Sequence, residues 1–226
     1  MKHTTARLIR FLFLASVAGI WLAAPRPCKA DSVGPNAVGF IKQVNGTVTV
    51  LRSGHHFNAA RSAPVLLHDK FTTSRRSSIE IALNTGGELD MSESSSLEID
   101  QYIFNSITGA NSTLIDLLVG KLRSIVPFAS GKTDFKLRTG NAICGVRGTE
   151  FETAYIVGKP CPGFPKCLRY TDVGVGHGTV EVRSTTNPTA KPVSVTAGYE
   201  TTVPCEIPPS SPSPLGASEL ELPGYR

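Results

Sequence analysis

The sequence predicts an all-β protein: a single domain built as an antiparallel β-sandwich, jelly-roll-like in its connections, over residues 37–203. Apolar and polar residues alternate in many short segments, as they do in strands with one buried face. Turn-forming residues separate these segments, and no long window follows the period of an amphipathic helix. About a dozen short strands of this kind can enclose one hydrophobic core.

The alternation is clearest where isoleucine, leucine and valine recur at every second position. The expected strand faces are 48–50, 79–83, 89–91, 97–99, 135–137, 180–182 and 193–195. Turns are expected at Asn45-Gly46, at Thr85-Gly86-Gly87 and at Thr108-Gly109. The segment 114–125 carries Gly120 at its centre, and we interpret it as a hairpin rather than a helix.

Residues 1–30 have the pattern of a secretory signal peptide. Three basic residues precede an uncharged run from Phe11 to Ala24. That run is shorter than the roughly 20 apolar residues of a membrane-spanning helix, and no later segment is as long. We expect cleavage after Ala30 and a periplasmic or secreted protein that does not span the membrane. Acylation of Cys28 is the minor alternative, because the preceding Pro-Arg-Pro is atypical of lipoproteins.

The formal net charge of +5 does not indicate a nucleic-acid partner. Five of the 23 basic residues lie before residue 31, where no acidic residue occurs. The remaining 18 basic residues equal the 18 acidic ones in number, so the mature chain is expected to be neutral. We therefore expect no binding to nucleic acid.

Four cysteines remain after the leader, an even number that suits an oxidising compartment. Cys161 and Cys167 bracket a turn-forming insert, so we expect a disulfide between them. Cys144 and Cys205 then remain for a second one, although the other two connectivities stay open. The spacing does not match a zinc site, and we expect neither a metal nor another cofactor.

The segment 204–226 is rich in proline and serine. Such a composition does not form a core, so we expect a flexible tail. A proline-rich ligand for a partner's groove is the functional alternative.

The segment Gly145-Val146-Arg147-Gly148-Thr149-Glu150-Phe151 resembles the valine-arginine-glycine-threonine-x-phenylalanine signature of the FecR-type domain, found in bacterial signalling and exported proteins. Further segments resemble that family over about residues 40–203, namely 44–50, 71–73, 78–83, 178–182 and 195–199. His68-Asp69 departs from the family's usual Gly-Asp turn, Gly140-Asn141 replaces a proline-containing step, and the Cys161 to Cys167 insert is additional. None of these departures changes the expected strand count.

The resemblance implies a β-sandwich but not the family's sigma-factor role. Membrane regulators of this family carry a cytoplasmic anti-sigma segment and a transmembrane helix before the domain. Only the cleavable leader precedes it here, so we expect a stand-alone exported member.

The signature residues Gly145, Val146, Arg147, Gly148, Thr149 and Phe151 are expected to hold the scaffold. Arg147 offers five donors for a carboxylate, and we favour a buried structural ion pair over a binding role. Gly148 would allow a bulge or a close approach, and Thr149 a local hydrogen bond.

Neither the histidines nor the acidic residues show a catalytic or metal-binding pattern. His55, His56, His68 and His177 lack the spacing of a zinc enzyme, and we interpret them as loop residues. The acidic residues around 90–116 are expected on a solvated sheet face rather than at a calcium site. We expect no catalytic residue, although His55, His68 and Asp69 gathered in one cleft would favour an envelope hydrolase.

These observations favour an exported, non-catalytic binding or scaffold module of the bacterial envelope. Its expected partner is an envelope or extracellular protein rather than a glycan, because Trp21, in the leader, is the single tryptophan. Pairing of a partner strand with a sheet edge is a plausible mechanism. The alternative from another class is a periplasmic sensor module that acts with a separate membrane regulator. The sequence does not define an oligomeric state.

Overall fold

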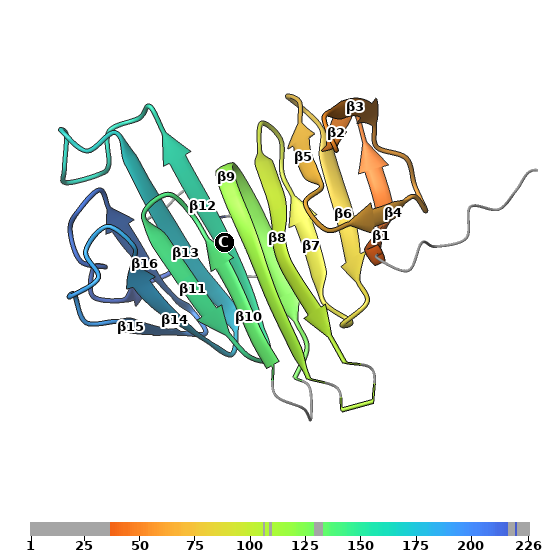
Figure 1. The fold of residues 1–226 in the computed structure, drawn as a ribbon. Helices are drawn as coiled ribbons and strands as arrows, with labels where there is room; N and C mark the ends of the chain where they lie inside the picture. Colours follow the sequence, from red (N-terminus) through yellow and green to blue (C-terminus); the bar gives the residue numbers. More distant parts are fainter. Residues whose placement is uncertain (1–36, 106, 109, 129–132, 217–219, 221–226) are drawn as a thin grey trace, which may run out of the picture. The chain divides into compact units, whose positions relative to one another are not determined.

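A computed structural model describes residues 37–105, 107–108, 110–128, 133–216 and 220 (Figure 1). The proposed leader lies outside these residues. The described part of the chain is all-β: it forms seventeen strands and contains no helix. The predicted fold class is therefore confirmed.

The strands pair in two rows that share β9 (Asn111–Val126). In order of pairing, row A consists of β4 (Pro64–Leu66), β1 (Ala37–Asn45), β6 (Ser78–Leu83), β7 (Glu88–Met91), β9, β12 (Thr149–Val157), β13 (Arg169–His177), β16 (Tyr199–Pro204) and β17 (Ser213–Pro214). Row B consists of β3 (His55–Asn58), β2 (Val48–Arg52), β5 (Lys70–Thr73), β8 (Ser96–Phe104), β9, β10 (Thr133–Arg138), β11 (Ala142–Val146), β14 (Thr179–Ser184) and β15 (Val193–Thr196). We call the strands before β9 the N-half and those after it the C-half.

Strand β9 passes from one row to the other. Residues 111–119 pair with β8 in row B, and residues 120–126 pair with β12 in row A. The change occurs at Gly120, whose φ is +95°. A Cβ at this position would lie 2.5 Å from the Cα of Ser95, so only glycine fits without displacement. The predicted hairpin over 114–125 is therefore wrong: the glycine bends one continuous strand.

All pairings are antiparallel except that of β9 with β10. Thr133 to Arg138 run parallel to Asn111 to Asp116, because the chain leaves β9 in row A and returns to row B beside its starting end. The rest of the antiparallel prediction is confirmed.

The alternating apolar residues of both rows form one large hydrophobic cluster. Phe71 and Leu97 in row B and Ile81 and Phe151 in row A are fully buried in it. Each such side chain stabilises the fold by about 1.5–3 kcal/mol relative to an exposed one. A single cluster supplied by both rows is consistent with the predicted two-layer sandwich.

A second, smaller cluster lies in the C-half and includes part of the proline-rich segment. Leu215 and Leu220 pack with Ile156 and Tyr170. The backbone N–H of Ser210 donates to the carbonyl of Thr202 at 2.9 Å, and β17 pairs with β16. The described part of 204–226 is therefore not the free tail that its composition predicts, because its few apolar residues dock on a surface that the sandwich already provides.

One disulfide joins Cys167 to Cys205, with Cα atoms 5.7 Å apart. Cys144 and Cys161 are buried free thiols. Both expected pairings are therefore wrong. The cause is strand pairing: Tyr170 of β13 faces Pro204 of β16, which places Cys205 beside Cys167, whereas Cys144 belongs to the large cluster.

Candidate functional site

The FecR-like signature forms the turn that carries the chain from β11 in row B to β12 in row A. Val146 and Phe151 point into the large cluster. Gly148 has a φ of +62°, which favours glycine, and the Thr149 hydroxyl donates to the carbonyls of Arg147 and Thr179, each at 3.1 Å. These contacts fit a scaffold role for the signature, which stays a prediction.

Arg147 is not buried, in contrast to the buried structural position that we expected. The residue is exposed, and its guanidinium lies 4.7 Å from the centre of the Phe128 ring. A Cβ at Gly148 would come within 3.0 Å of the same ring, so the glycine allows the phenylalanine to approach. The exposed position results from the turn, which directs Arg147 away from the core while its neighbours enter it.

His68 and Asp69 do not act as a pair. Asp69 is fully buried and accepts two hydrogen bonds from Arg52, to Oδ1 from Nε at 2.7 Å and to Oδ2 from Nη2 at 2.6 Å. It also accepts the backbone N–H of Leu66 at 2.8 Å, so it fixes the β4–β5 turn. His68 is exposed with a φ of +65°, a conformation that explains why a glycine is usual there.

The other histidines after the proposed leader are exposed: His55 and His56 lie on edge strand β3, and His177 lies at the end of β13. The described residues contain no group of three histidine, cysteine or carboxylate side chains that could hold a metal ion. No helix in the described part of the chain is long and apolar enough to cross a membrane.

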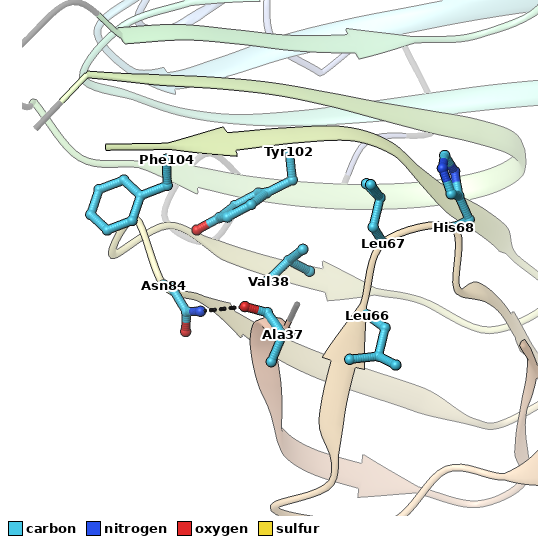
Figure 2. Close-up of a pocket in the computed structure, with 8 residues that line it drawn as sticks. All are labelled: Ala37, Val38, Leu66, Leu67, His68, Asn84, Tyr102 and Phe104. Atoms are coloured by element: carbon cyan, nitrogen blue, oxygen red, sulfur yellow. Dashed lines mark hydrogen bonds between the residues drawn. The ribbon is translucent and has the colours of Figure 1, made fainter. Parts of the chain in front are cut away.

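A cavity of about 700 Å³ opens in the N-half between β1, β4 and β8 (Figure 2). It is lined by Ala37, Val38, Leu66, Leu67, His68, Asn84, Tyr102 and Phe104. Figure 2 shows Tyr102 and Phe104 of β8 on one side, with Leu67 and His68 at the far end of that side. We call this the β1–β8 cavity.

Asn84 fixes the floor of the cavity. Its Nδ2 donates to the carbonyl of Ala37 at 2.7 Å, and its backbone N–H donates to the carbonyl of Val38 at 2.9 Å. These bonds join the β6–β7 turn to the start of β1, so the floor of the cavity is already formed before any partner binds.

The Tyr102 hydroxyl is a polar group of the cavity that can still make a hydrogen bond. Its oxygen is buried and makes no hydrogen bond of acceptable geometry within the described residues. Burial raises the pKa of Tyr102, and polar contacts with the side chain and backbone of Thr85, which fall short of good hydrogen-bond geometry, only partly oppose that rise. A buried donor of this kind is rare in a native protein, and a bound acceptor would satisfy it.

The rim of the β1–β8 cavity carries exposed apolar side chains beside the exposed His68. Leu67 is 36% exposed and Phe104 is 42% exposed. Ile107, in the turn that follows β8, is 94% exposed. An apolar surface beside a cavity with one directed donor has the composition of a recognition site.

The outer faces of the strands carry cross-strand ion pairs, as expected for the acidic residues. Arg138 of β10 donates to Asp116 of β9 at 2.5 and 2.7 Å, and reaches Asp100 of β8 at 3.1 Å. In row A, Arg123 links Asp90 with Glu150. Burial is the largest effect on Asp90 and raises its pKa, although Arg123 opposes this. These groups pair with each other and cover the sheet.

Sequence reasoning did not find the residues that form the β1–β8 cavity. Tyr102 and Phe104 continue the strand that begins at Ser96, and their spacing of two was a usable signal that they share a face. The ion pair of Arg52 with Asp69 could not be predicted from residue spacing. It forms because the β4–β5 turn, which carries Asp69, lies against the end of β2.

The family model described as FecR protein matches residues 69–160. Crystal structures at 2.50 and 1.65 Å of a Parabacteroides distasonis ATCC 8503 protein assigned as an anti-sigma factor are 18% and 17% identical, with TM-scores of 0.45. Each alignment covers 60% of this chain and 54% of that protein, so this chain spans about half of its length. A cell surface anchoring domain is 28% identical over 28% of this chain and 84% of its own, with a TM-score of 0.27. No curated protein matches.

Proposed function

Because residues 69–160 match the FecR family model, we propose that this protein is an exported, non-catalytic binding module that recognises a protein of the bacterial envelope through the β1–β8 cavity. The signature turn holds the scaffold, and the cavity in the N-half receives the partner. The recognised element is an apolar or aromatic side chain that carries a hydrogen-bond acceptor.

The observation that carries this proposal is the buried Tyr102 hydroxyl beside an apolar rim. An acceptor on the partner would complete this donor, while Leu67 and Phe104 would lose their exposure to water. Burial of such a donor without a partner costs about 1–3 kcal/mol, so filling the cavity recovers free energy that the isolated fold lacks.

A protein partner suits the site better than a glycan. The rim combines aliphatic Leu67 with a single exposed ring, that of Phe104. Glycan sites typically stack sugars on flat aromatic platforms, and the single tryptophan of the chain, Trp21, lies in the proposed leader. Pairing of a partner strand is available at edge strand β3, whose four residues are all exposed.

Export is supported by the leader pattern and by the disulfide. A bond between Cys167 and Cys205 is typical of a compartment outside the cytoplasm. The equal numbers of basic and acidic residues after Ala30 give no net positive charge that would attract nucleic acid.

The test is recovery of partners from the native envelope with tagged full-length protein, compared with two variants of the cavity. Leu67→Asp places a charge on the apolar rim, and Tyr102→Phe removes only the hydroxyl. We expect both to lose the specific companion while the thermal stability of Tyr102→Phe is unchanged or higher. Leu118→Asp, an equally exposed leucine on β9 outside the cavity, is the matched control and should retain the companion. Equal recovery with all three variants would exclude the cavity as the binding site.

The FecR match favours one second candidate, a periplasmic sensor module that acts on a separate membrane regulator. The same experiment separates the two. Recovery of a membrane regulator, lost in Leu67→Asp, supports the sensor function, whereas a companion that is not a regulator supports the general binding module.

A further inference from the structure

Three of the four mature cysteines gather in the small C-half cluster, away from the β1–β8 cavity. Cys167 and Cys205 are bonded to each other, and Cys161 is a free thiol beside them in the same cluster. Ala154 and Ile156 of β12 pack against them. The third sulfur therefore lies in the same apolar environment as the bonded pair.

The backbone places Cys161 next to Cys167. The N–H of Cys161 donates to the carbonyl of Cys167 at 2.8 Å. Cys161 also packs in the same small cluster as Cys167, so the two residues are neighbours both through the backbone and through their side chains. Cys205 is a neighbour of Cys167 as well, since its N–H donates to the Cys167 sulfur at 3.0 Å. Cys167 can therefore bond either neighbour without a large movement of the chain.

The three sulfurs differ in their access to solvent. Cys161 and Cys167 are buried, whereas Cys205 is partly exposed. Both residues of the disulfide line an open cavity of about 590 Å³ together with Gly163, Phe164, Pro165, Lys166, Glu206 and Ile207. A sulfur released from the disulfide at Cys205 would remain at this cavity and in contact with solvent.

We propose that Cys161, Cys167 and Cys205 form a thiol–disulfide exchange site through which the protein forms a mixed disulfide with a disulfide-bearing partner. In the first step the Cys161 sulfur, having lost its proton, attacks the Cys167 sulfur. The bond between Cys161 and Cys167 forms, the bond between Cys167 and Cys205 breaks, and Cys205 leaves as a thiolate. No electrons enter or leave the protein in this step.

In the second step the Cys205 thiolate attacks a disulfide of the partner. A bond forms between Cys205 and one partner sulfur, and the other partner sulfur leaves as a thiolate that takes up the proton released by Cys161. Cys161 thus has the role of an internal nucleophile and Cys205 that of the attachment site. The site does not depend on the proposed function of the β1–β8 cavity.

Exchange would also release the segment after β16. Cys205 is the covalent link between that segment and the β12–β13 loop. Ser210 and β17 hold the same segment to β16 by hydrogen bonds, and Leu215 and Leu220 hold it by apolar packing. Movement of the disulfide to Cys161 would leave these non-covalent contacts as the attachment.

Oxidised glutathione serves as the probe for the exchange. The full chain is incubated with it, quenched in acid and mapped by mass spectrometry of its peptides. We expect glutathione on Cys205 together with a disulfide between Cys161 and Cys167. In Cys161→Ala the adduct on Cys205 should be lost, and in the matched control Cys144→Ala it should be unchanged. An adduct of equal yield in Cys161→Ala, or no adduct in the wild-type protein, would overturn the proposal.

A second variant tests the geometry without the adduct. In Cys205→Ser, incubation with oxidised glutathione should produce the disulfide between Cys161 and Cys167 in protein whose circular dichroism matches the wild type. Two separate glutathione adducts on Cys161 and Cys167, with no bond between them, would show that these sulfurs do not reach each other and would also overturn the proposal.

Discussion

The outer face of row A differs between the two halves of the molecule. In the N-half, β6 and β7 alternate strictly between buried and partly exposed residues, and their outer face carries ion pairs such as that of Lys42 with Glu88. In the C-half, six consecutive residues of β12 and six of β13 are buried. The same row of strands is thus open to solvent at one end and covered at the other.

The cause of this difference is the segment after β16. Leu215 and Leu220 cover the outer side of Ala154 and Ile156. The coverage also buries acidic residues: Glu152, Asp172 and Glu200 are each 4% exposed. Asp172 accepts a hydrogen bond from the Thr202 hydroxyl at 2.6 Å. Alternation of apolar and polar residues therefore marks the outer face of a strand only where no other segment packs on it.

On the inner face, by contrast, removal of a buried side chain should lower the free energy of unfolding by a similar amount in both halves. Phe71→Ala in the N-half and Phe151→Ala in the C-half each remove a fully buried ring from the large cluster. We expect each to lower the free energy of unfolding by about 3–5 kcal/mol, measured by urea denaturation. A loss confined to one of them would show that the two halves do not share a core.

The disulfide should matter only for the covered half. Cys205→Ser removes a bond that closes a separation of 38 residues, and we expect a loss of about 2–4 kcal/mol in the free energy of unfolding. Hydrogen exchange should become faster at the amides of β12 and β13, while those of β6 and β7 keep their wild-type rates. Faster exchange in both halves would contradict the assignment of the covering segment to the C-half alone.

Gly120 tests the joint between the halves. Gly120→Ala places a Cβ against Ser95 and forces a non-glycine residue to a φ of +95°. We expect a loss of about 1–3 kcal/mol, measured by thermal unfolding. Gly145→Ala is the control, since a Cβ there meets nothing within 4 Å, and it should unfold close to the wild-type temperature.

The ion pairs of the open face should contribute least. Asp90→Asn removes a partly exposed partner of Arg123, and we expect a change below about 1 kcal/mol at neutral pH. Since burial raises the pKa of Asp90 above 3.8, the folded protein binds that proton more tightly than the unfolded chain does. The contribution of Asp90 to stability should therefore be greatest in acid and fall as the pH rises through this range. Unfolding of the wild type and of Asp90→Asn between about pH 3 and pH 7 measures it, and an increase with pH would contradict the raised pKa.

The sequence predicted the all-β class and most strand positions, because alternation reports one buried face directly. The faces of Ile79 and Ile81 lie where alternation placed them. The prediction failed at Gly120, because a glycine in the sequence is equally compatible with a chain reversal and with a bend within one strand. It also failed for 204–216, because the composition of a segment does not reveal that its apolar residues dock elsewhere.

The candidate sites were harder to predict for a related reason. Tyr102 and Phe104 form a cavity only because β1 and β4 lie opposite β8, and the choice of Cys205 over Cys161 as the partner of Cys167 follows from the pairing of β13 with β16. Long-range register decides both, and a single sequence contains no local signal for it. The scaffold role of the signature around Arg147 remains a prediction.

Strand β9 also imposes an order on assembly. Strands β1 to β8 find all their partners among themselves or in β9, so this part of both rows can form as soon as the chain reaches Val126. Until then each row ends in an open edge, at β7 and at β8. The arrival of β9 closes both edges and presents two new ones, to which β10 and β12 add. In a chain synthesised from its N-terminus, the later strands can therefore add to the sheet in sequence, and β9 provides the two edges on which that addition begins.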